Sequence, residues 1–323
     1  MPVISYREAL NEALREEMQR DENIFILGED VGFYGGAFKV TEGLFAEFGE
    51  KRVVDTPIAE GLIVGAAIGA AMVGLRPIAE LMTVNFALLA MDQIVNHAAK
   101  IHYMFGGKIR VPLVVRAPGG GGKQLGAQHS QSLESYFVHC PGVKVVMPST
   151  PEDAKGLLKE AIRDDDPIVF LEHEHLYNTK GEVPPGEYTI PIGKATIRRS
   201  GRDLTIVAYS NMVLTAQEAA EKLEKEGISV EIVDPRTLKP LDIHTIVASV
   251  KKTHRVIVVE EDWKTGGVGA EIGSQIYEHA FTALDAPIIR VAGKDTPMPY
   301  AKNLEHAAIP QVEDIIQAAI NLL

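Results

Sequence analysis

The sequence predicts an α/β protein with two doubly wound domains. Short runs rich in β-branched residues alternate with longer helical patterns, which is typical of parallel sheets built from β-α units. The 323 residues, 46% hydrophobic and 24% charged, are enough for about two globular domains. A stretch rich in proline and glycine over residues 180–193 separates two such sets and indicates an inter-domain linker.

The expected elements follow from these patterns in chain order. In the first set, β-branched runs predict strands at 24–27, 76–80, 113–116, 144–147 and 168–171. Helical stretches between them predict helices such as 6–20, 86–103 and 151–163. After the linker, the second set has predicted strands at 204–208, 230–234, 256–260 and 288–291, with helices such as 215–226 and 269–281.

Residues 55–74 contain one carboxylate at the start of an otherwise apolar, small-residue helix. Thr56 can cap this helix and Pro57 suits a first turn, so we expect Glu60 in that turn or just after it. Gly61, Gly65 and Gly69 recur at a spacing of four, which leaves a face where another backbone can approach closely. Because glycine within a helix costs about 1 kcal/mol relative to alanine, the pattern needs a packing reason, and we expect contact with another subunit.

Two other interpretations of this helix remain. It is also consistent with a core helix in which Glu60 merely complements the helix dipole. A membrane span is disfavoured, because the uncharged run is shorter than the roughly 20 residues that a bilayer needs and Arg76 follows closely.

Composition excludes several classes of function. The net charge of −12 disfavours sequence-independent binding to nucleic acid or to an anionic membrane, since both depend on Lys and Arg neutralising phosphate. Cys140 is the only cysteine, so neither an intrachain disulfide nor a CxxC site is possible. Residues 1–7 have no apolar signal region, and we expect a cytoplasmic location, or an organelle matrix after processing.

Two glycine runs resemble nucleotide loops only superficially. The run Gly119–Gly122 followed by Lys123 lacks the first glycine and the final Ser or Thr of a phosphate loop. It fits better a mobile loop at the carboxyl end of a strand, where open α/β sheets place ligand clefts. The run over 266–271 lacks the complete dinucleotide fingerprint.

Histidines offer two further candidates. His129, in Gln-His-Ser-Gln after the first glycine run, is the natural acid/base candidate, but the residues alone favour a structural histidine that caps the next helix. The run Glu172-His173-Glu174-His175 suggests a metal site, but it ends a strand whose side chains alternate between faces and no third ligand is evident.

Taken together, several motifs resemble one family over essentially the whole chain. They are DTPIAE at 55–60, MTVNF at 82–86, GAQHSQ at 126–131, CPGVKVV at 140–146, AIRDDDP at 161–167 and DTPMPYAKNLEHAAIPQVEDII at 295–316. The chain resembles the β subunits of the thiamin-diphosphate-dependent pyruvate dehydrogenase component. Acetoin and branched-chain 2-oxo acid dehydrogenase β subunits share most of these motifs, and a mainly scaffolding subunit is a further alternative.

The resemblance implies a transketolase-like pyrimidine-binding domain over 1–185, a linker over 186–199 and a transketolase C-terminal domain over 200–323. It implies thiamin diphosphate as cofactor, with Mg²⁺ held by an α subunit in an α₂β₂ heterotetramer, because no Gly-Asp-Gly motif occurs in this chain. It also implies that the subunit-binding and lipoyl domains of a dihydrolipoyl acetyltransferase are partners.

Site residues are carried over by matching positions. The resemblance implies that Glu60 hydrogen-bonds N1′ of the cofactor's aminopyrimidine and that Phe86 stacks on that ring. It places His129 near the lipoyl channel, as a proton donor during acyl transfer. It also implies a structural K⁺ site formed largely by backbone carbonyls, at Leu113, Ala161, Ile162, Asp164 and Asp166. The family commonly has asparagine at the position of Asp166.

Overall fold

The computed structural model describes residues 1–323, which form two compact units. The first unit comprises residues 1–119 and 136–192, and the second comprises residues 120–135 and 193–323. The sequence predicts a linker over 180–193, and the resemblance implies one over 186–199; the structure in addition groups the segment 120–135 with the second unit.

The first unit is built around a parallel sheet. Its strands lie in the order β6-β7-β5-β4-β2-β3, and every neighbouring pair is parallel. The register places Ile26 opposite Val53 on one side and Ile78 on the other. The strands are β2 (Ile24–Gly28), β3 (Val53–Asp55), β4 (Arg76–Glu80), β5 (Val114–Gly119), β6 (Lys144–Val146) and β7 (Ile168–His173).

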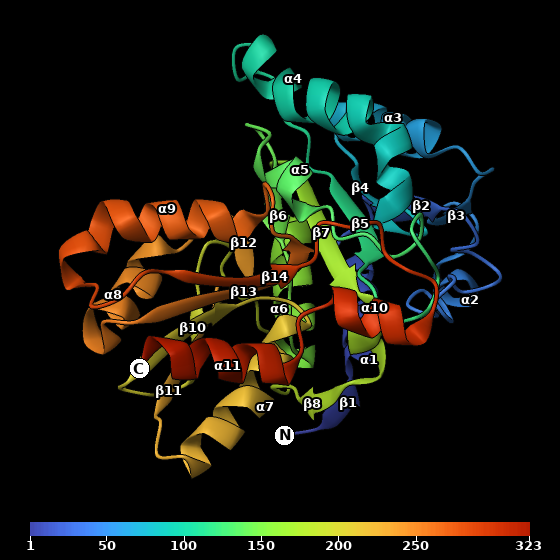
Figure 1. The fold of residues 1–323 in the computed structure, drawn as a ribbon. Coiled ribbons are helices and arrows are strands. Elements are labelled where there is room, and N and C mark those ends of the chain that lie inside the picture. Colours follow the sequence, from blue (N-terminus) through green and yellow to red (C-terminus); the bar gives the residue numbers. More distant parts are fainter. The chain divides into compact units, whose positions relative to one another are not determined.

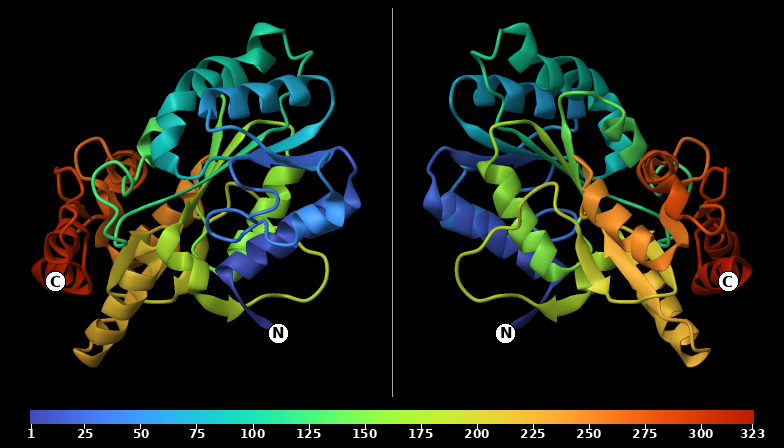
Figure 2. Two further views of the ribbon diagram at one scale, coloured as in Figure 1. Left: turned by 90° about the vertical axis from the view of Figure 1, so that its right-hand side faces the viewer. Right: turned by 90° about the vertical axis from the view of Figure 1, so that its left-hand side faces the viewer.

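Helices cover both faces of this sheet (Figures 1 and 2). Helix α3 and the helical run that ends with α4 lie on one face, and α1 and α6 lie on the other. Helices of the first unit are α1 (Tyr6–Arg20), α2 (Leu44–Phe48), α3 (Glu60–Met72), η1 (Val84–Ala90), η2 (Gln93–Ala98), α4 (Ala99–Met104), α6 (Pro151–Arg163) and η3 (Glu174–Asn178). The short strands β1 (Val3–Ser5) and β8 (Lys180–Glu182) pair antiparallel, and α5 spans Glu134–Val138.

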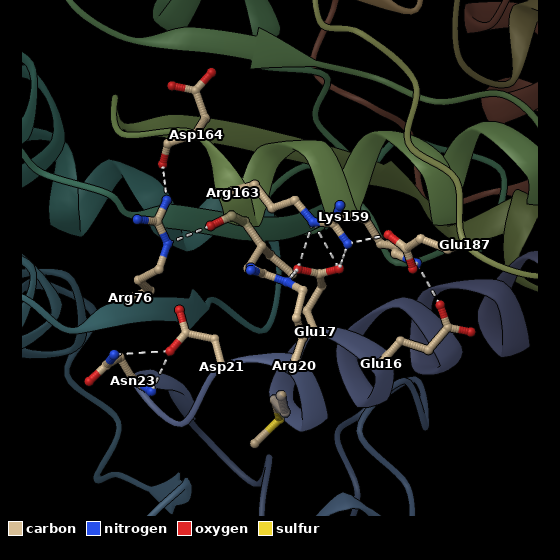
Figure 3. A network of polar contacts seen from close by, with 12 residues as sticks. Glu16, Glu17, Arg20, Asp21, Asn23, Arg76, Lys159, Arg163, Asp164 and Glu187 are labelled. Carbon is tan, nitrogen blue, oxygen red and sulfur yellow. Dashed lines mark hydrogen bonds and ion pairs between the residues drawn. The ribbon is translucent and has the colours of Figure 1, made fainter.

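Polar side chains join α1 to α6 (Figure 3). The ammonium group of Lys159 is completely buried and lies 2.7 Å from a carboxylate oxygen of Glu16 and 2.6 Å from one of Glu187. Arg163 hydrogen-bonds the fully buried carboxylate of Glu17 and also reaches Glu187. Because each buried charge has a partner of opposite sign, the network can form without an unpaired ion in the interior.

The second unit holds a five-stranded sheet in the order β14-β13-β10-β11-β9. Only β9 is antiparallel to its neighbour; the other pairs are parallel. Its strands are β9 (Thr196–Arg199), β10 (Leu204–Ala208), β11 (Val230–Asp234), β13 (Val256–Trp263) and β14 (Ile289–Gly293). The short strand β12 (Thr237–Lys239) of this unit is not part of this sheet. The helices are α7 (Met212–Lys225), α8 (Ile243–Thr253), α9 (Val268–Ala280), η4 (Phe281–Ala283), α10 (Lys302–Ala308) and α11 (Val312–Leu322).

One face of this sheet carries a continuous apolar core. Side chains of α7 and α11, among them Leu223 and Ile315, pack against Ile206, Ile232 and Ile257 of the central strands. Helices α8 and α9 lie on the opposite face (Figure 1). The predicted fold class, two doubly wound α/β units, is therefore confirmed.

Two local predictions are wrong. The run predicted as one helix over 86–103 is divided into a 3₁₀ segment (η1), a π segment (η2) and the short helix α4. The predicted cap at Thr56 is absent, because α3 begins at Glu60 with Ala59 as its N-cap and no side chain caps it. The Thr56 hydroxyl is buried without a hydrogen-bond partner.

Candidate active site

The carboxyl ends of β2, β3 and β4 meet at one edge of the first sheet. Gly28, the last residue of β2, lies opposite Asp55 of β3 and Glu80 of β4 in the parallel register. A Cβ atom on Gly28 would lie 2.5 Å from the Glu80 carbonyl oxygen, so this close approach requires glycine. Ligand sites of open α/β sheets form at such an edge.

Glu60 is the first residue of α3, directly after this edge. Its side chain is buried, with only 5% of the residue exposed, and it forms neither a hydrogen bond nor an ion pair with the rest of the chain. The side chain therefore has unused acceptor capacity of the kind that a bound N–H donor satisfies.

Glu29 follows β2 and is an acidic neighbour of Glu60 that sequence reasoning missed. Burial raises the pKa of its carboxyl, and the charges of Asp30 and Glu60 raise it further. Glu60 and Glu29 are thus close enough for their charges to repel. The only signal in the sequence was the position of Glu29 immediately after a buried strand.

Phe86 lies on η1, which packs against α3. The missing Cβ of Gly61 would be 3.5 Å from the Leu89 carbonyl oxygen of η1, and that of Gly65 would be 3.3 Å from the Gln93 amide oxygen. Phe86, whose ring is half-buried, is therefore carried by η1, which packs against α3, the helix that begins at Glu60. The glycine face therefore serves a close contact within the chain, although Gly69 meets nothing within 4 Å.

A buried arginine supports the same strand edge. The guanidinium of Arg116 on β5 hydrogen-bonds Glu172 of β7 at 2.5 and 2.8 Å and also bonds Glu80 of β4. Tyr177 donates its hydroxyl to Glu172 at 2.7 Å. Burial raises the pKa of Glu80, and the charge of Arg116 opposes this effect. The network fixes three neighbouring strands where the site begins.

His129 belongs to the second unit, with the segment 120–135. It is exposed, and its backbone N–H closes a turn by donating to the Gly126 carbonyl at 3.2 Å. Within the first unit, the structure brings Glu60 and Phe86 onto adjoining elements.

The five residues expected at a K⁺ site come from the end of α6 and its neighbours. The carbonyls of Ile162 and Asp164 accept hydrogen bonds from Arg76, at 2.9 and 2.5 Å. The Lys144 ammonium lies 2.6 Å from the Asp164 carboxylate and 3.1 Å from that of Asp166. The Leu113 carbonyl accepts from the Ile168 amide at 2.8 Å. Carbonyl oxygens have two lone pairs, so these bonds leave each one able to bind a further donor or a cation.

Other candidates carry no comparable site. Glu172, His173 and Glu174 are buried around the end of β7, and no group of three His, Cys, Asp or Glu side chains is arranged to hold a metal ion. Cys140 is buried, with its sulfur 3.2 Å from the Tyr136 carbonyl oxygen. None of the helices combines the length and the apolar character that a membrane crossing requires.

Comparisons with known proteins identify the family. Residues 3–180 match the family model "Transketolase, pyrimidine binding domain" and residues 193–315 match "Transketolase, C-terminal domain". A solved structure titled "Split gene transketolase, inactive beta4 tetramer" aligns with a TM-score of 0.80 and 27% identity, and the alignment covers 99% of this chain and 98% of that one.

Curated relatives are more similar. The chain is 52% identical over 320 residues to "Pyruvate dehydrogenase E1 component subunit beta, mitochondrial" of Dictyostelium discoideum, which covers 98% of this chain and 90% of the relative. It is 52% identical over 315 residues to "Pyruvate dehydrogenase E1 component subunit beta" of Rickettsia conorii, with 98% and 97% covered. The resemblance seen in the motifs is therefore confirmed, and the chain belongs to the family of pyruvate dehydrogenase E1 component β subunits.

Proposed function

We propose that this chain acts with an α subunit in the thiamin-diphosphate-dependent oxidative decarboxylation of pyruvate. In this proposal the acetyl unit passes to the lipoyl group of a dihydrolipoyl acetyltransferase, and the whole complex produces acetyl-CoA and CO₂. The observation that carries the proposal is Glu60, a buried carboxylate without a partner in the chain, at the carboxyl edge of the sheet. The names of the relatives support the substrate.

The residues of this site fit the aminopyrimidine half of thiamin diphosphate. When bound, the cofactor supplies an electron sink for the bond to the departing carboxylate. Glu60 would hold the pyrimidine by accepting a hydrogen bond from N1′, which would satisfy its unused acceptor capacity and favour proton removal by the cofactor. Phe86 offers a flat apolar surface for the ring and holds its orientation.

The diphosphate half needs another chain. Mg²⁺ sites of this kind use oxygen ligands, and this sequence has no Gly-Asp-Gly motif to supply them. We assign those ligands to the α subunit of an α₂β₂ heterotetramer. An exposed apolar surface over α3, η1 and α4 supports a subunit contact here. Its more than half-exposed side chains are Ile58, Leu62, Val73, Leu89, Tyr103 and Met104.

His129 is proposed as the proton donor when the acyl group reaches the lipoyl sulfur. An exposed imidazole on a turn can meet a large incoming domain, and histidine exchanges protons near neutral pH. The K⁺ site also stays part of the proposal. The last carbonyls of a helix lack intrahelical partners, so those of Ala161 and Ile162 suit a weakly hydrated cation. We place the chain in the cytoplasm, or in an organelle matrix where a leader has been removed.

The test uses this chain co-expressed with its α subunit, supplied with thiamin diphosphate and Mg²⁺. Pyruvate-dependent reduction of an artificial electron acceptor should require both chains. Glu60→Gln should keep the tetramer intact and lose about 10²-fold or more of the activity, as is typical for a positioned acid/base group. Glu50→Gln, an exposed carboxylate of the same unit, is the matched control and should leave activity unchanged.

Other outcomes would change the assignment. Near-normal turnover by Glu60→Gln would remove Glu60 from the chemistry. Activity with acetoin or branched-chain 2-oxo acids, but not with pyruvate, would keep the machinery and change the substrate. No activity with any of these substrates in a well-formed tetramer would favour a scaffold subunit.

A further inference from the structure

The glycine run after β5 binds carboxylates of its own chain. The backbone N–H groups of Gly122 and Gln124 both donate to Glu305 of α10, each with a shortest distance of 2.9 Å. The N–H of Gly121 donates to Glu261 at 2.6 Å. Three amides of one short loop therefore point at two carboxylates of the same unit.

The loop conformation explains this concentration of donors. Gly120 and Gly122 have φ values of +90° and +92°, and Gln124 has a φ of +58°. Left-handed residues that alternate with others turn successive N–H groups toward one side and create a concave anion site. The residues Glu305 and Glu261 are only 2% and 8% exposed, so their charges depend on these amides for stabilisation.

Packing fixes the loop against the segment 295–309. A Cβ atom on Gly121 would lie 2.8 Å from Ile309 Cδ1 and 2.9 Å from Met298 Cε, so only glycine fits without displacement. A Cβ on Gly126 would touch the ring of Tyr300 at 3.4 Å. The loop and the segment 295–309 are thus two parts of one structure.

The other end of the segment 120–135 is also fastened. The buried hydroxyl of Tyr209 donates to Glu134 at 3.1 Å, and the Ser132 hydroxyl lies 3.4 Å from Glu261. In the sequence, His129 lies between the loop amides at 121–124 and these contacts at 132–134. The segment that carries His129 is consequently held at both ends by hydrogen bonds whose acceptors include Glu305 and Glu261.

We propose that Glu305 is a positioning residue for His129, acting as a built-in anion that fills the amide site of the glycine loop. The proposal rests on the function proposed for His129 in acyl transfer. In this proposal the amides of the glycine loop bind the carboxylate of Glu305, an internal group, and not the phosphate of a nucleotide. A small external carboxylate should therefore be able to replace the missing side chain in a truncated variant.

The experiment uses the α₂β₂ protein with Glu305→Ala and, as a matched control, Glu221→Ala, an exposed glutamate of α7. Lys123 is an exposed residue of the loop, so the rate of trypsin cleavage after it reports how ordered the loop is. This readout does not depend on enzyme activity. Artificial acceptor reduction reports on decarboxylation, and acetylation of a free lipoyl domain reports on acyl transfer. Each measurement is made with and without sodium formate, at constant ionic strength.

We expect Glu305→Ala to speed cleavage after Lys123 and to slow lipoyl acetylation about 10-fold or more, since small displacements of a catalytic group are costly. The rate of decarboxylation should change less than about 3-fold, because the displaced group, His129, is proposed to act only in acyl transfer. Formate should slow the cleavage and restore part of the acetylation, which no general loss of stability would produce. Glu221→Ala should match the wild type throughout.

Contrary outcomes are distinguishable. Unchanged cleavage in Glu305→Ala would overturn the anchoring role, and faster cleavage with unchanged acetylation would overturn the positioning role. If Glu305→Ala fails to assemble, Glu305→Gln, which keeps one acceptor oxygen, should show the same defects more weakly and without formate rescue; wild-type behaviour would again overturn the proposal. A wild-type tetramer inactive on pyruvate would overturn the acyl-transfer role together with the proposed function, and the cleavage data would still report on the loop.

Discussion

Arg116 and Glu172 form a two-pronged hydrogen-bonded ion pair in the interior of the first unit, with both side chains at 1% exposure or less. The same guanidinium bonds Glu80, so one cation serves two buried carboxylates. Burial alone would lower the pKa of Arg116, but the two carboxylates raise it above its usual value, and the arginine stays charged.

Arg116→Met should destabilise the protein strongly, because it leaves Glu80 and Glu172 without their counter-ion. We expect a loss of about 3–5 kcal/mol in the free energy of unfolding, the range for breaking a buried ion pair from one side. Urea denaturation at fixed protein concentration measures it. Arg202→Met, which removes an arginine that is 81% exposed, is the control and should change stability by less than about 0.5 kcal/mol. Equal stability of the two variants would contradict the structural role of Arg116.

Glu187→Gln should weaken the network between α1 and α6 in a pH-dependent way. Hydrogen bonds from Lys159 and Arg163 lower the pKa of Glu187 from 4.5 to about 2. A carboxyl whose pKa is depressed by folding stabilises the native state fully above the unfolded value and loses this contribution as the pH falls toward the folded value. The stability gap between wild type and variant should thus be constant from pH 7 to pH 4.5 and narrow below that. Urea titrations across this window measure the gap, and one that widens on acidification would refute the assignment.

His129→Ala should slow acyl transfer to a lipoyl domain more than it slows decarboxylation. The expected loss in the first half-reaction is about 10²-fold, the usual contribution of a general acid. Rapid-quench measurements of lipoyl acetylation follow acyl transfer, and reduction of an artificial acceptor follows decarboxylation. Together they separate the two half-reactions. Equal losses in both would argue for a general structural role of the imidazole.

Potassium should stabilise the protein if the carbonyls near Asp164 bind it. A ligand that binds only the folded state at 100 times its Kd adds about 2.7 kcal/mol, so the Tm in KCl should exceed that in choline chloride at equal ionic strength. Sodium, which is smaller, should give a lesser increase. The same Tm in all three salts would indicate that Lys144 and Arg76 satisfy these oxygens without a cation.

Most of the fold could be predicted because its signals are local. The predicted strands at 24–27, 76–80, 204–208 and 230–234 coincide with observed strands to within a residue, since buried parallel strands have short β-branched runs. The helix over 86–103 could not be predicted in its real form. Its division into 3₁₀, π and α segments accompanies the close approach of Leu89 and Gln93 to the glycine face of α3, a tertiary contact with no local signature.

The site could be predicted only in part, and for the same reason. Glu60 stands out because a lone carboxylate precedes an uncharged helix. Arg116, by contrast, pairs with Glu80 and Glu172, which are 36 and 56 positions away. No residue pattern near Arg116 in the sequence indicates a buried ion network. The partnership of the glycine run with Glu305 spans 183 positions. The roles of Glu60, Phe86 and His129 and the cation site at Leu113 and its neighbours remain predictions.

The discontinuity of the second unit has a consequence for how the chain is made. The glycine loop leaves the ribosome long before Glu305, so its amides cannot bind this carboxylate until the 183 residues that follow Gly122 have been synthesised. Forming such distant contacts is slow, because a long loop must close first. A fragment that starts at Gly193 would also lack the amides that stabilise Glu305 and Glu261. The second unit is therefore not an independent module of residues 193–323, and it becomes complete only after both the glycine loop and Glu305 have emerged.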